Sequence, residues 1–261
     1  MAKNRWKIWY FARMKSTAHR TAIVTGAARG IGAATARRLA RDGIYVAVLD
    51  LAEGACASVV TEILEAGGRA CAVGADVTIE AEVAEAVERV TSELGAPTIL
   101  VNNAGILRDD LLFKLSLADW DAVMSVHLRG TFLMSRAVLP QMLTRGSGRI
   151  INTASQLAYK GAPGFSAYTA AKGAILSLTR SLALEVGPGE VTVNCVAPGA
   201  TRTPMLEDVP AEILEQIRLS IPLGRLAEVA DIVPSYLFLA SEQGRHYQGQ
   251  CLSPNGGDVF L

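Results

Sequence analysis

The chain has 261 residues, of which 50% are hydrophobic and 19% are charged. An apolar share of this size supplies a sizeable core and excludes a chain that is mainly disordered. Basic and acidic residues number 25 each, but residues 1–20 contain six Lys or Arg and no acid, which leaves 19 basic against 25 acidic residues in the remainder. This mildly acidic body argues against a protein that binds nucleic acid.

The first nineteen residues differ in composition from the rest. A short aromatic patch, Trp6–Phe11, lies between basic residues. It is too short to span a bilayer and is followed by no small-residue cleavage site. We predict a disordered basic extension over residues 1–19, with Met14 as a second available start, and no association with a membrane. A transit peptide or a segment that lies on a membrane surface is the alternative.

From residue 20 to residue 261, short apolar runs alternate with amphipathic segments that end at glycines. The strands are predicted at Thr21–Thr25, Ile44–Asp50, Arg69–Gly74, Thr98–Asn102, Gly148–Thr153, Val191–Val196 and Gln250–Ser253. The helices are predicted at Gly30–Asp42, Ala52–Ala66, Ile79–Leu94, Asp119–Leu143, Ser166–Val186 and Leu226–Ser241. Strands that alternate with helices through short connections form a parallel sheet with right-handed crossovers. We therefore predict one doubly wound α/β domain over residues 20–261.

The four cysteines, Cys56, Cys71, Cys195 and Cys251, are scattered and form no Cys-x-x-Cys pair. No cysteine or histidine has the spacing of a metal site, so we expect no metal. Cysteines used as small apolar core residues are typical of a reducing compartment. We therefore expect a cytoplasmic protein.

A glycine-rich segment, TGAARGIG at residues 25–32, connects the first predicted strand to the first helix. Glycines in this position let a pyrophosphate approach the backbone and the positive end of the helix. The spacing is GxxxGxG rather than the GxGxxG of the general dinucleotide fingerprint. A glycine-rich turn that serves packing alone is the alternative.

Asp50 ends the second predicted strand, about twenty residues after the glycines. A carboxylate here accepts hydrogen bonds from both adenosine ribose hydroxyls and repels a 2′-phosphate. Arg29 favours the opposite choice, because a guanidinium in the loop attracts a 2′-phosphate. We predict NAD as the preferred cofactor, with NADP as the alternative, and a helix cap as the other interpretation of Asp50.

Tyr168 and Lys172 stand four residues apart on a predicted helix and therefore share one face. A phenol ordinarily titrates near pH 10, and an ammonium one turn away stabilises the phenolate and lowers its pKa. Ser155 follows a predicted strand and can donate a hydrogen bond to the oxygen that the tyrosine protonates. A Tyr-x-x-x-Lys pair alone is also a common surface pattern.

These motifs together resemble the short-chain dehydrogenase/reductase family. TGAARGIG, NNAG at residues 102–105, Ser155, YTAAK at residues 168–172 and NCVAPGATRT at residues 194–203 follow the order and spacing of that family. The resemblance covers the chain from about Thr21 to the C-terminus. It implies a Rossmann-type domain with a seven-stranded parallel sheet flanked by helices, nicotinamide-dependent interconversion of an alcohol and a ketone, no metal, and a homotetramer or homodimer.

The resemblance also assigns roles to residues. It implies that Tyr168 is the general acid/base, that Lys172 lowers its pKa and holds the nicotinamide ribose, and that Ser155 orients the substrate oxygen. The residues that it implies for cofactor binding lie in several segments: Gly26, Arg29, Gly30, Ile31, Gly32, Asp50, Asp76, Val77, Asn103, Ala104, Gly105, Tyr168, Lys172, Pro198, Gly199, Thr201 and Thr203.

His127 departs from the family pattern, which usually has an asparagine at this position. That asparagine belongs to a helix kink that binds a water in the proton relay from the lysine. An imidazole can also hold a water and can exchange protons near neutral pH. The adjacent HLRGTF resembles the hydroxyacyl-CoA dehydrogenase part of peroxisomal multifunctional enzymes. We include His127 among the candidate catalytic residues, with a packing residue as the alternative.

The substrate side is less determined. Residues 201–225 are expected to cover a small-molecule alcohol or ketone as a short mobile lid, through Met205, Leu206, Val209, Ile213, Leu214, Ile217 and Leu219. Arg108, Arg202 and Arg218 either meet an acidic part of the substrate or are solvated. A 3-oxoacyl or 3-hydroxyacyl thioester is one predicted substrate, and a cyclic alcohol or cis-dihydrodiol is the other. A cofactor-binding sensor without activity is the third interpretation.

Overall fold

The computed structural model describes residues 19–207 and 209–260. The predicted extension therefore lies, except for its last residue, outside the described residues. Seven strands are present in the described part: β1 (Thr21–Thr25), β2 (Tyr45–Asp50), β3 (Ala70–Gly74), β4 (Ile99–Asn102), β5 (Ser147–Thr153), β6 (Glu190–Val196) and β7 (Cys251–Leu252). All seven coincide with predicted strands to within a few residues.

The strands form one parallel sheet in the order β3-β2-β1-β4-β5-β6-β7. The order reverses between β1 and β4, so the loops after these two strands diverge to opposite sides and leave a crevice at the carboxyl ends. The predicted doubly wound α/β domain with a seven-stranded parallel sheet is confirmed. The central strands are buried on both faces, which is why they occur in the sequence as continuous apolar runs.

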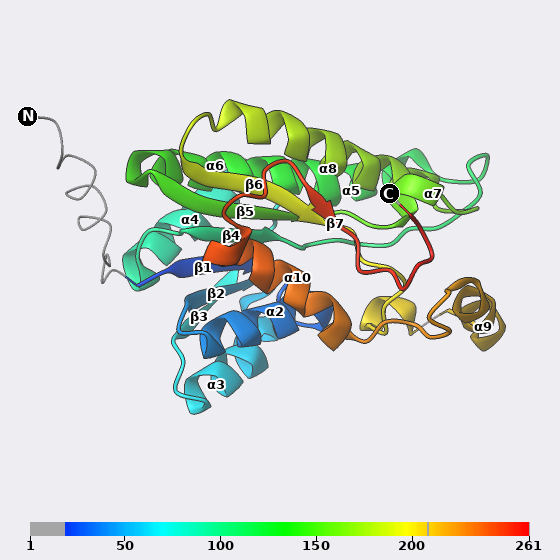
Figure 1. Ribbon diagram of the computed structural model, residues 1–261, viewed down its shortest axis with the longest axis horizontal. Coiled ribbons are helices and arrows are strands. Elements are labelled where there is room, and N and C mark those ends of the chain that lie inside the picture. The colour runs from blue at the N-terminus through cyan, green and yellow to red at the C-terminus, as the bar shows by residue number, and fades with distance from the viewer. Residues whose placement is uncertain (1–18, 208, 261) are drawn as a thin grey trace, which may run out of the picture.

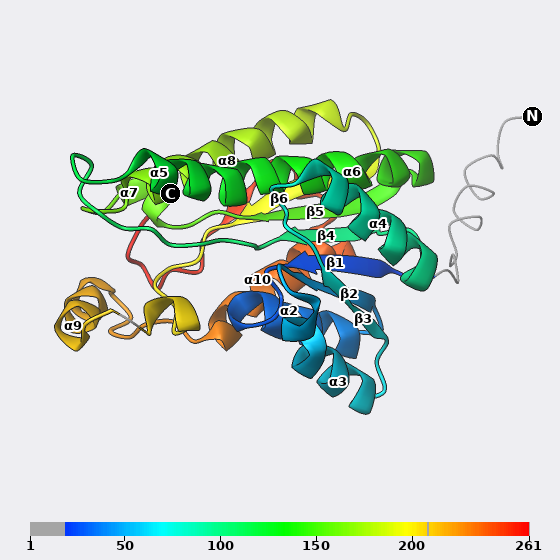
Figure 2. The same ribbon diagram turned by 180° about the vertical axis from the view of Figure 1, so that it is seen from behind.

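Helices cover both faces of the sheet (Figure 1; Figure 2 gives the view from behind). One layer contains α4 (Glu80–Leu94), α6 (Gly130–Arg145) and α8 (Ser166–Glu185), with α5 (Leu117–Met124) beside α8. The other contains α2 (Gly30–Arg41), α3 (Ala57–Glu65) and α10 (Val229–Ala240). Each layer buries its own apolar cluster against the sheet, and the sheet separates the two clusters.

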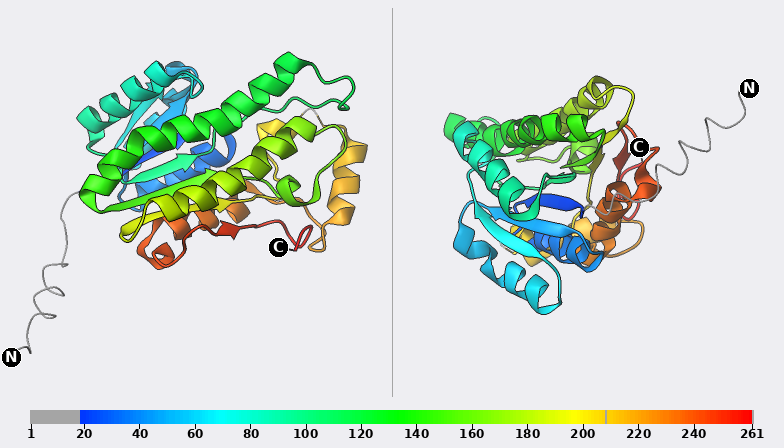
Figure 3. Two further views of the ribbon diagram at one scale, coloured as in Figure 1. Left: turned by 90° about the horizontal axis from the view of Figure 1, so that it is seen from above. Right: turned by 90° about the vertical axis from the view of Figure 1, so that its left-hand side faces the viewer.

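Two short or peripheral helices lie beyond the carboxyl ends of the strands (Figure 3). They are α7 (Leu157–Lys160) and α9 (Ala211–Ser220). The segment that we expected to be a lid contains α9 and a 3₁₀ turn, Pro204–Leu206. No residue of α9 is buried, which agrees with a position outside the core.

One predicted helix is divided in the structure. The segment predicted as a single helix over 119–143 consists of α5, a π-helical turn at Ser125–Arg129 and α6. The prediction of a continuous α-helix is therefore wrong in this turn. A π turn accommodates an extra residue within a helix without interrupting it, and such turns often occur at functional sites. His127 lies in this turn.

In the described part of the chain, no helix is both long enough and apolar enough to cross a membrane.

Candidate active site

The candidate residues gather at the carboxyl edge of the sheet because each follows the end of a different strand. The glycine-rich turn follows β1, Asp50 ends β2, and Asp76 lies two residues after β3. Residues 103–105 follow β4, Ser155 lies two residues after β5, and residues 198–203 follow β6. In open α/β sheets, ligands bind at this edge beside the point where the strand order reverses.

The turn after β1 and the loop after β4 are tightly joined. Thr25 Oγ1 accepts hydrogen bonds from the backbone N–H groups of Asn103 and Ala104, both at 3.0 Å. The Asn103 amide nitrogen donates to the carbonyl oxygens of Thr25 (3.1 Å) and Gly26 (3.0 Å). A Cβ on Gly26 would lie 2.7 Å from the Cα of Ala104, so this contact requires glycine. The motif of residues 102–105 therefore supports the glycine-rich turn.

Gly32 and Gly30, the other two glycines of the turn, are required for different reasons. A Cβ on Gly32 would lie 2.3 Å from the carbonyl oxygen of Gly26, whereas Gly30 has a φ of +59° that favours glycine. The Cβ position of Gly30 lies 3.7 Å from Thr203 Cγ2, which brings the turn after β1 against the segment after β6.

The first turn of α2 presents unoccupied backbone donors. No side chain caps this helix at Arg29, and no acid lies in its first turn. Such a helix end suits an anionic diphosphate. Ile31 packs its side chain on the core beneath, and Arg29 is exposed without an ion pair among the described residues.

Asp50 lies where the sequence predicts it, beside the glycine-rich turn. Its Oδ2 accepts a hydrogen bond from the backbone of Ala28 at 2.9 Å, and its Oδ1 accepts one from the backbone of Leu51 at 2.9 Å. Each carboxylate oxygen can accept a further hydrogen bond. Asp50 therefore orders the turn and still presents acceptors at the end of β2.

Asp76 and Val77 form the next part of the edge. Asp76 Oδ1 accepts from the backbone of Thr78 at 2.8 Å, and the backbone N–H of Asp76 donates to Glu82 at 2.7 Å. Val77 is buried, and a Cβ on Gly130 would lie 2.7 Å from Val77 Cγ2. Val77 thus packs on the first residue of α6.

The segment after β6 is held by its own hydroxyls. Thr201 Oγ1 donates to the carbonyl of Gly199 at 2.8 Å, and Thr203 Oγ1 donates to the carbonyl of Thr201 at 3.4 Å. The carbonyl of Pro198 accepts from the backbone of Gln156 at 3.0 Å. This segment therefore contacts the residue that directly follows Ser155.

Ser155, Tyr168 and Lys172 come together between β5 and α8. Ser155 and Lys172 are buried, and Tyr168 is partly buried. Lys172 Nζ donates to the carbonyl of Thr153 at 2.6 Å and lies 5.6 Å from the centre of the Tyr168 ring. The three side chains that the sequence singled out therefore form one group.

Burial governs the protonation of this group. It lowers the pKa of the Lys172 ammonium to about 7. It raises the pKa of the Tyr168 phenol above its usual value, while hydrogen bonding with Ser155 acts in the opposite direction. We expected the Lys172 ammonium to lower the pKa of the Tyr168 phenol. In the structure this pKa is raised instead, because burial disfavours the phenolate.

His127 lies against the same group. Its ring meets the Tyr168 ring edge-on, with centroids 5.3 Å apart. His127 Nε2 lies 2.8 Å from the carbonyl oxygen of Ile106 and 3.2 Å from its backbone nitrogen. Nδ1 is buried and has no hydrogen-bond partner among the described residues. One side of the imidazole is thus anchored, and the other presents an unpaired polar atom.

The expectation that His127 exchanges protons near neutral pH is not met. Burial, and next the charge of Lys172, lower the pKa of His127 to about 3. The imidazole is therefore neutral at pH 7, and it can accept or donate a hydrogen bond without acting as a cation.

The arginines considered for the substrate are each paired with an acid. Arg108 lies 3.4 Å from Asp119, Arg202 lies 3.2 Å from Glu228, and Arg218 lies 2.6 Å from Glu215. These cations are already neutralised by neighbours on the surface.

Two supporting groups were missed at the level of sequence. Thr25 joins two loops, and the carbonyl of Thr153 holds Lys172. The position of Thr25 at the start of TGAARGIG could have identified it from the sequence. The carbonyl of Thr153 could not be identified in this way, because every residue has a backbone carbonyl. Within residues 19–207 and 209–260, no three His, Cys, Asp or Glu side chains are grouped to hold a metal ion.

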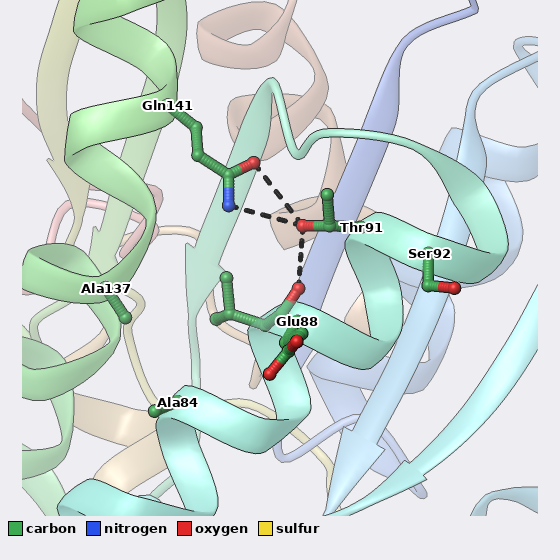
Figure 4. Close-up of a pocket in the computed structure, with 7 residues that line it drawn as sticks. Ala84, Glu88, Thr91, Ser92, Ala137 and Gln141 are labelled. Carbon is green, nitrogen blue, oxygen red and sulfur yellow. Dashed lines mark hydrogen bonds between the residues drawn. The ribbon is translucent and has the colours of Figure 1, made fainter.

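A hollow of about 470 Å³ lies elsewhere, between α4 and α6. Figure 4 shows its lining, which includes Ala84, Glu88 and Ala137, with Thr91 and Gln141 hydrogen-bonded to each other. It contains none of the candidate site residues and is a surface groove between two helices.

Comparison with known proteins gives full-length similarities. A family model described as enoyl-(acyl carrier protein) reductase matches residues 26–258. The short-chain reductase protein NovJ of Streptomyces niveus is 41% identical over 90% of this chain and 92% of its own length. The 3-oxoacyl-[acyl-carrier-protein] reductase FabG of Staphylococcus aureus (strain Mu50) is 39% identical, over 94% of this chain and 99% of its own. The BbsD subunit of (2S)-[(R)-hydroxy(phenyl)methyl]succinyl-CoA dehydrogenase of Thauera aromatica is 39% identical, over 92% and 96%.

Proposed function

The chain belongs to the short-chain dehydrogenase/reductase family and is an oxidoreductase that acts on CH–OH groups with NAD(P) as acceptor, and we propose that its substrate is a 3-hydroxyacyl or 3-oxoacyl thioester. The observation that carries the reaction, the interconversion of an alcohol and a ketone, is the group formed by Ser155, Tyr168 and Lys172 at the carboxyl edge of the sheet. The printed activities of the relatives FabG and BbsD support the choice of a thioester.

Each residue of the group has one task. Tyr168 donates a proton to the carbonyl oxygen in reduction and accepts it back in oxidation. Ser155 donates a hydrogen bond to the same oxygen and stabilises the negative charge that develops on it. Lys172, with a pKa lowered to about 7, supplies charge beside the phenol and a proton to replace the one transferred.

The edge of the sheet fits a nicotinamide dinucleotide. The uncapped N-terminus of α2 and Gly30 suit the diphosphate, Asp50 the adenosine ribose, and Asp76 and Val77 the adenine. The backbone of residues 103–105 and residues 198, 199, 201 and 203 would hold the nicotinamide half, with Tyr168 and Lys172 beside its ribose. When bound, the nicotinamide supplies the acceptor or donor of hydride. We propose NAD as the preferred form because a carboxylate at Asp50 would accept hydrogen bonds from the ribose hydroxyls and would repel a 2′-phosphate.

We propose that His127 is a relay residue rather than an acid or base. Its Nδ1 is buried and unpaired among the described residues, and Lys172 is close enough to influence its protonation. A neutral imidazole can hold a water through Nδ1, and this water would pass protons between Lys172 and solvent.

We also propose a cytoplasmic homotetramer, with a homodimer as the smaller assembly. All four cysteines are free thiols. Exposed apolar side chains on the outer helices, Phe132 and Leu143 of α6 and Leu184 of α8, support self-association.

The test measures absorbance of the reduced nicotinamide with NADH or NADPH and a panel of carbonyl compounds. We expect turnover with 3-oxoacyl thioesters. Turnover confined to cyclic alcohols or cis-dihydrodiols would replace the proposed substrate. Tyr168→Phe is the matched control, because it removes the proton-transferring oxygen and keeps the ring. We expect turnover to fall about 10² to 10⁴-fold with cofactor affinity nearly unchanged. Wild-type turnover by Tyr168→Phe would refute the assignment of Tyr168.

A further inference from the structure

A buried carboxylate from the C-terminal segment lies beside the active site and has no role in the chemistry above. The Asp258 side chain is 4% exposed. Its Oδ2 accepts a hydrogen bond from Gln156 Nε2 at 2.7 Å and lies 2.5 Å from Lys160 Nζ. Its Oδ1 lies 3.4 Å from Ser220 Oγ, whose hydroxyl also donates to the carbonyl of Ile217 at 2.8 Å. Gln156 precedes α7, Lys160 ends α7, and Ser220 ends α9. One carboxylate thus connects the C-terminal segment to α7 and to the end of α9.

Gln156 transmits this contact to the reacting groups. It directly follows Ser155, it is buried, and its backbone donates to the carbonyl of Pro198 at 3.0 Å. Its Oε1 is buried without a hydrogen-bond partner among the described residues and lies 3.1 Å from the Cβ position of Gly199. The Gln156 side chain is therefore fixed between Asp258 and the segment that we assign to the nicotinamide.

The buried charge of Asp258 requires neighbours that pair with it. A buried carboxylate is costly unless it is paired and hydrogen-bonded, and Lys160, Gln156 and Ser220 together satisfy it. Without Asp258, the Gln156 amide would be left buried and unpaired. We then expect the Gln156 side chain to rearrange and to displace Ser155 or Gly199.

We propose that Asp258 is a positioning residue for the reaction: it sets Ser155 relative to residues 198–199 and anchors the end of α9 over the substrate. This inference rests on the proposed function. Lys160 also contacts the Asp258 carboxylate, from the more exposed side.

The experiment compares Asp258→Leu, Asp258→Asn and Lys160→Met with the wild type. Leucine has about the size of aspartate but no hydrogen-bond acceptor. We expect kcat/KM of Asp258→Leu to fall about ten- to hundredfold, because the reacting groups are displaced. The deuterium isotope effect on kcat, measured with a cofactor labelled at the transferred position, should rise as hydride transfer becomes slower. Asparagine still accepts from Gln156 and should recover most of the turnover. Lys160→Met leaves the buried carboxylate without its cation, so kcat/KM should fall as in Asp258→Leu but by a smaller factor.

Glu62→Gln is the matched control, because it weakens an ion pair with Arg37 in the α2–α3 layer, away from the site. We expect it to leave the kinetics and isotope effect unchanged. Thermal unfolding and cofactor titration accompany each variant, and Glu62→Gln should keep the wild-type cofactor affinity.

Wild-type kinetics and isotope effect in Asp258→Leu would overturn the inference. If Asp258→Leu does not fold, unchanged KM and kcat in Lys160→Met would overturn it instead. The substrate used is whichever compound of the panel the wild type turns over. Rejection of all thioesters would therefore refute the proposed substrate and leave the comparison of variants valid.

Discussion

At position 127 an imidazole lies where burial and a neighbouring ammonium both oppose its protonation. Burial lowers its pKa to about 3 from the usual histidine value of 6.5. Between these two values the unfolded chain binds a proton at His127 that the folded chain does not. The free energy of unfolding therefore falls as pH is lowered through this window, by at most about 1.4 kcal/mol per pH unit, and the contribution vanishes above it.

This sign predicts the behaviour of His127→Asn. Between pH 7 and pH 5 the wild type should lose about 2 kcal/mol more of its unfolding free energy than the variant, because asparagine does not titrate. Denaturant unfolding at the two pH values measures the difference. Equal losses in both proteins would show that His127 is protonated in the folded state.

Asp50 provides a second prediction at the scale of a residue. We expect NAD(H) to bind at least about tenfold more tightly than NADP(H), and Asp50→Ala to narrow that preference by about 1–3 kcal/mol. Because the carboxylate also holds the backbone of Ala28 and Leu51, Asp50→Asn is the better matched change, since it removes the charge and keeps an acceptor. Titration of both cofactors, with unfolding as a control, separates the two effects. Equal affinity of the wild type for NAD(H) and NADP(H) would contradict this prediction.

Among the elements, the loop after β4 and the π turn interlock. A Cβ on Gly105 would lie 2.4 Å from His127 Cε1, and the ring is buried with little room to move. Gly105→Ala should therefore destabilise the protein by about 1–3 kcal/mol. Gly173→Ala in α8, where a Cβ meets nothing within 4 Å, should be stabilising by about 1 kcal/mol and is the matched control.

A double variant tests whether the ring is the obstacle. Gly105→Ala combined with His127→Asn should recover part of the loss, because the smaller amide vacates the space that the new methyl group needs. Chemical unfolding of the four proteins gives the coupling. If the losses of unfolding free energy in the two single variants simply add in the double variant, the His127 ring is not what the new methyl group contacts.

The elements that were predicted from the sequence are those with a clear apolar pattern. β1 and β2 are continuous apolar runs because they are buried on both faces, α4 repeats its apolar residues with the helical period, and the motifs place the site at the carboxyl edge of the sheet. The residue pattern did not show the π turn, because one extra residue hardly alters a helical pattern, although the family resemblance implied a helix kink at position 127. α9 was missed because none of its residues is buried. Contacts such as Gln156 with Asp258 join loop residues about a hundred positions apart, which no local period encodes.

For the whole molecule, the two residues just before β1 already contact the domain. The His19 ring stacks on Tyr45 with centroids 4.4 Å apart, and Arg20 donates to the carbonyl of Ala240. A chain that starts at Met14 should therefore keep its fold and its turnover. Circular dichroism and the nicotinamide assay check this, and a loss of more than half the activity, about twofold, would contradict it.

Strand β1 is the first of the seven described strands in chain order, but it lies in the interior of the sheet, between β2 and β4. Its pairing with β2 is available early, whereas its other partner begins only at Ile99. A nascent chain that stops before β4 leaves the backbone of Thr21 and Ile23 open along one edge, and open apolar edges recruit strands from other chains. During translation, the interval between β3 and β4 is therefore when this topology most exposes the growing chain to aggregation and most requires a chaperone.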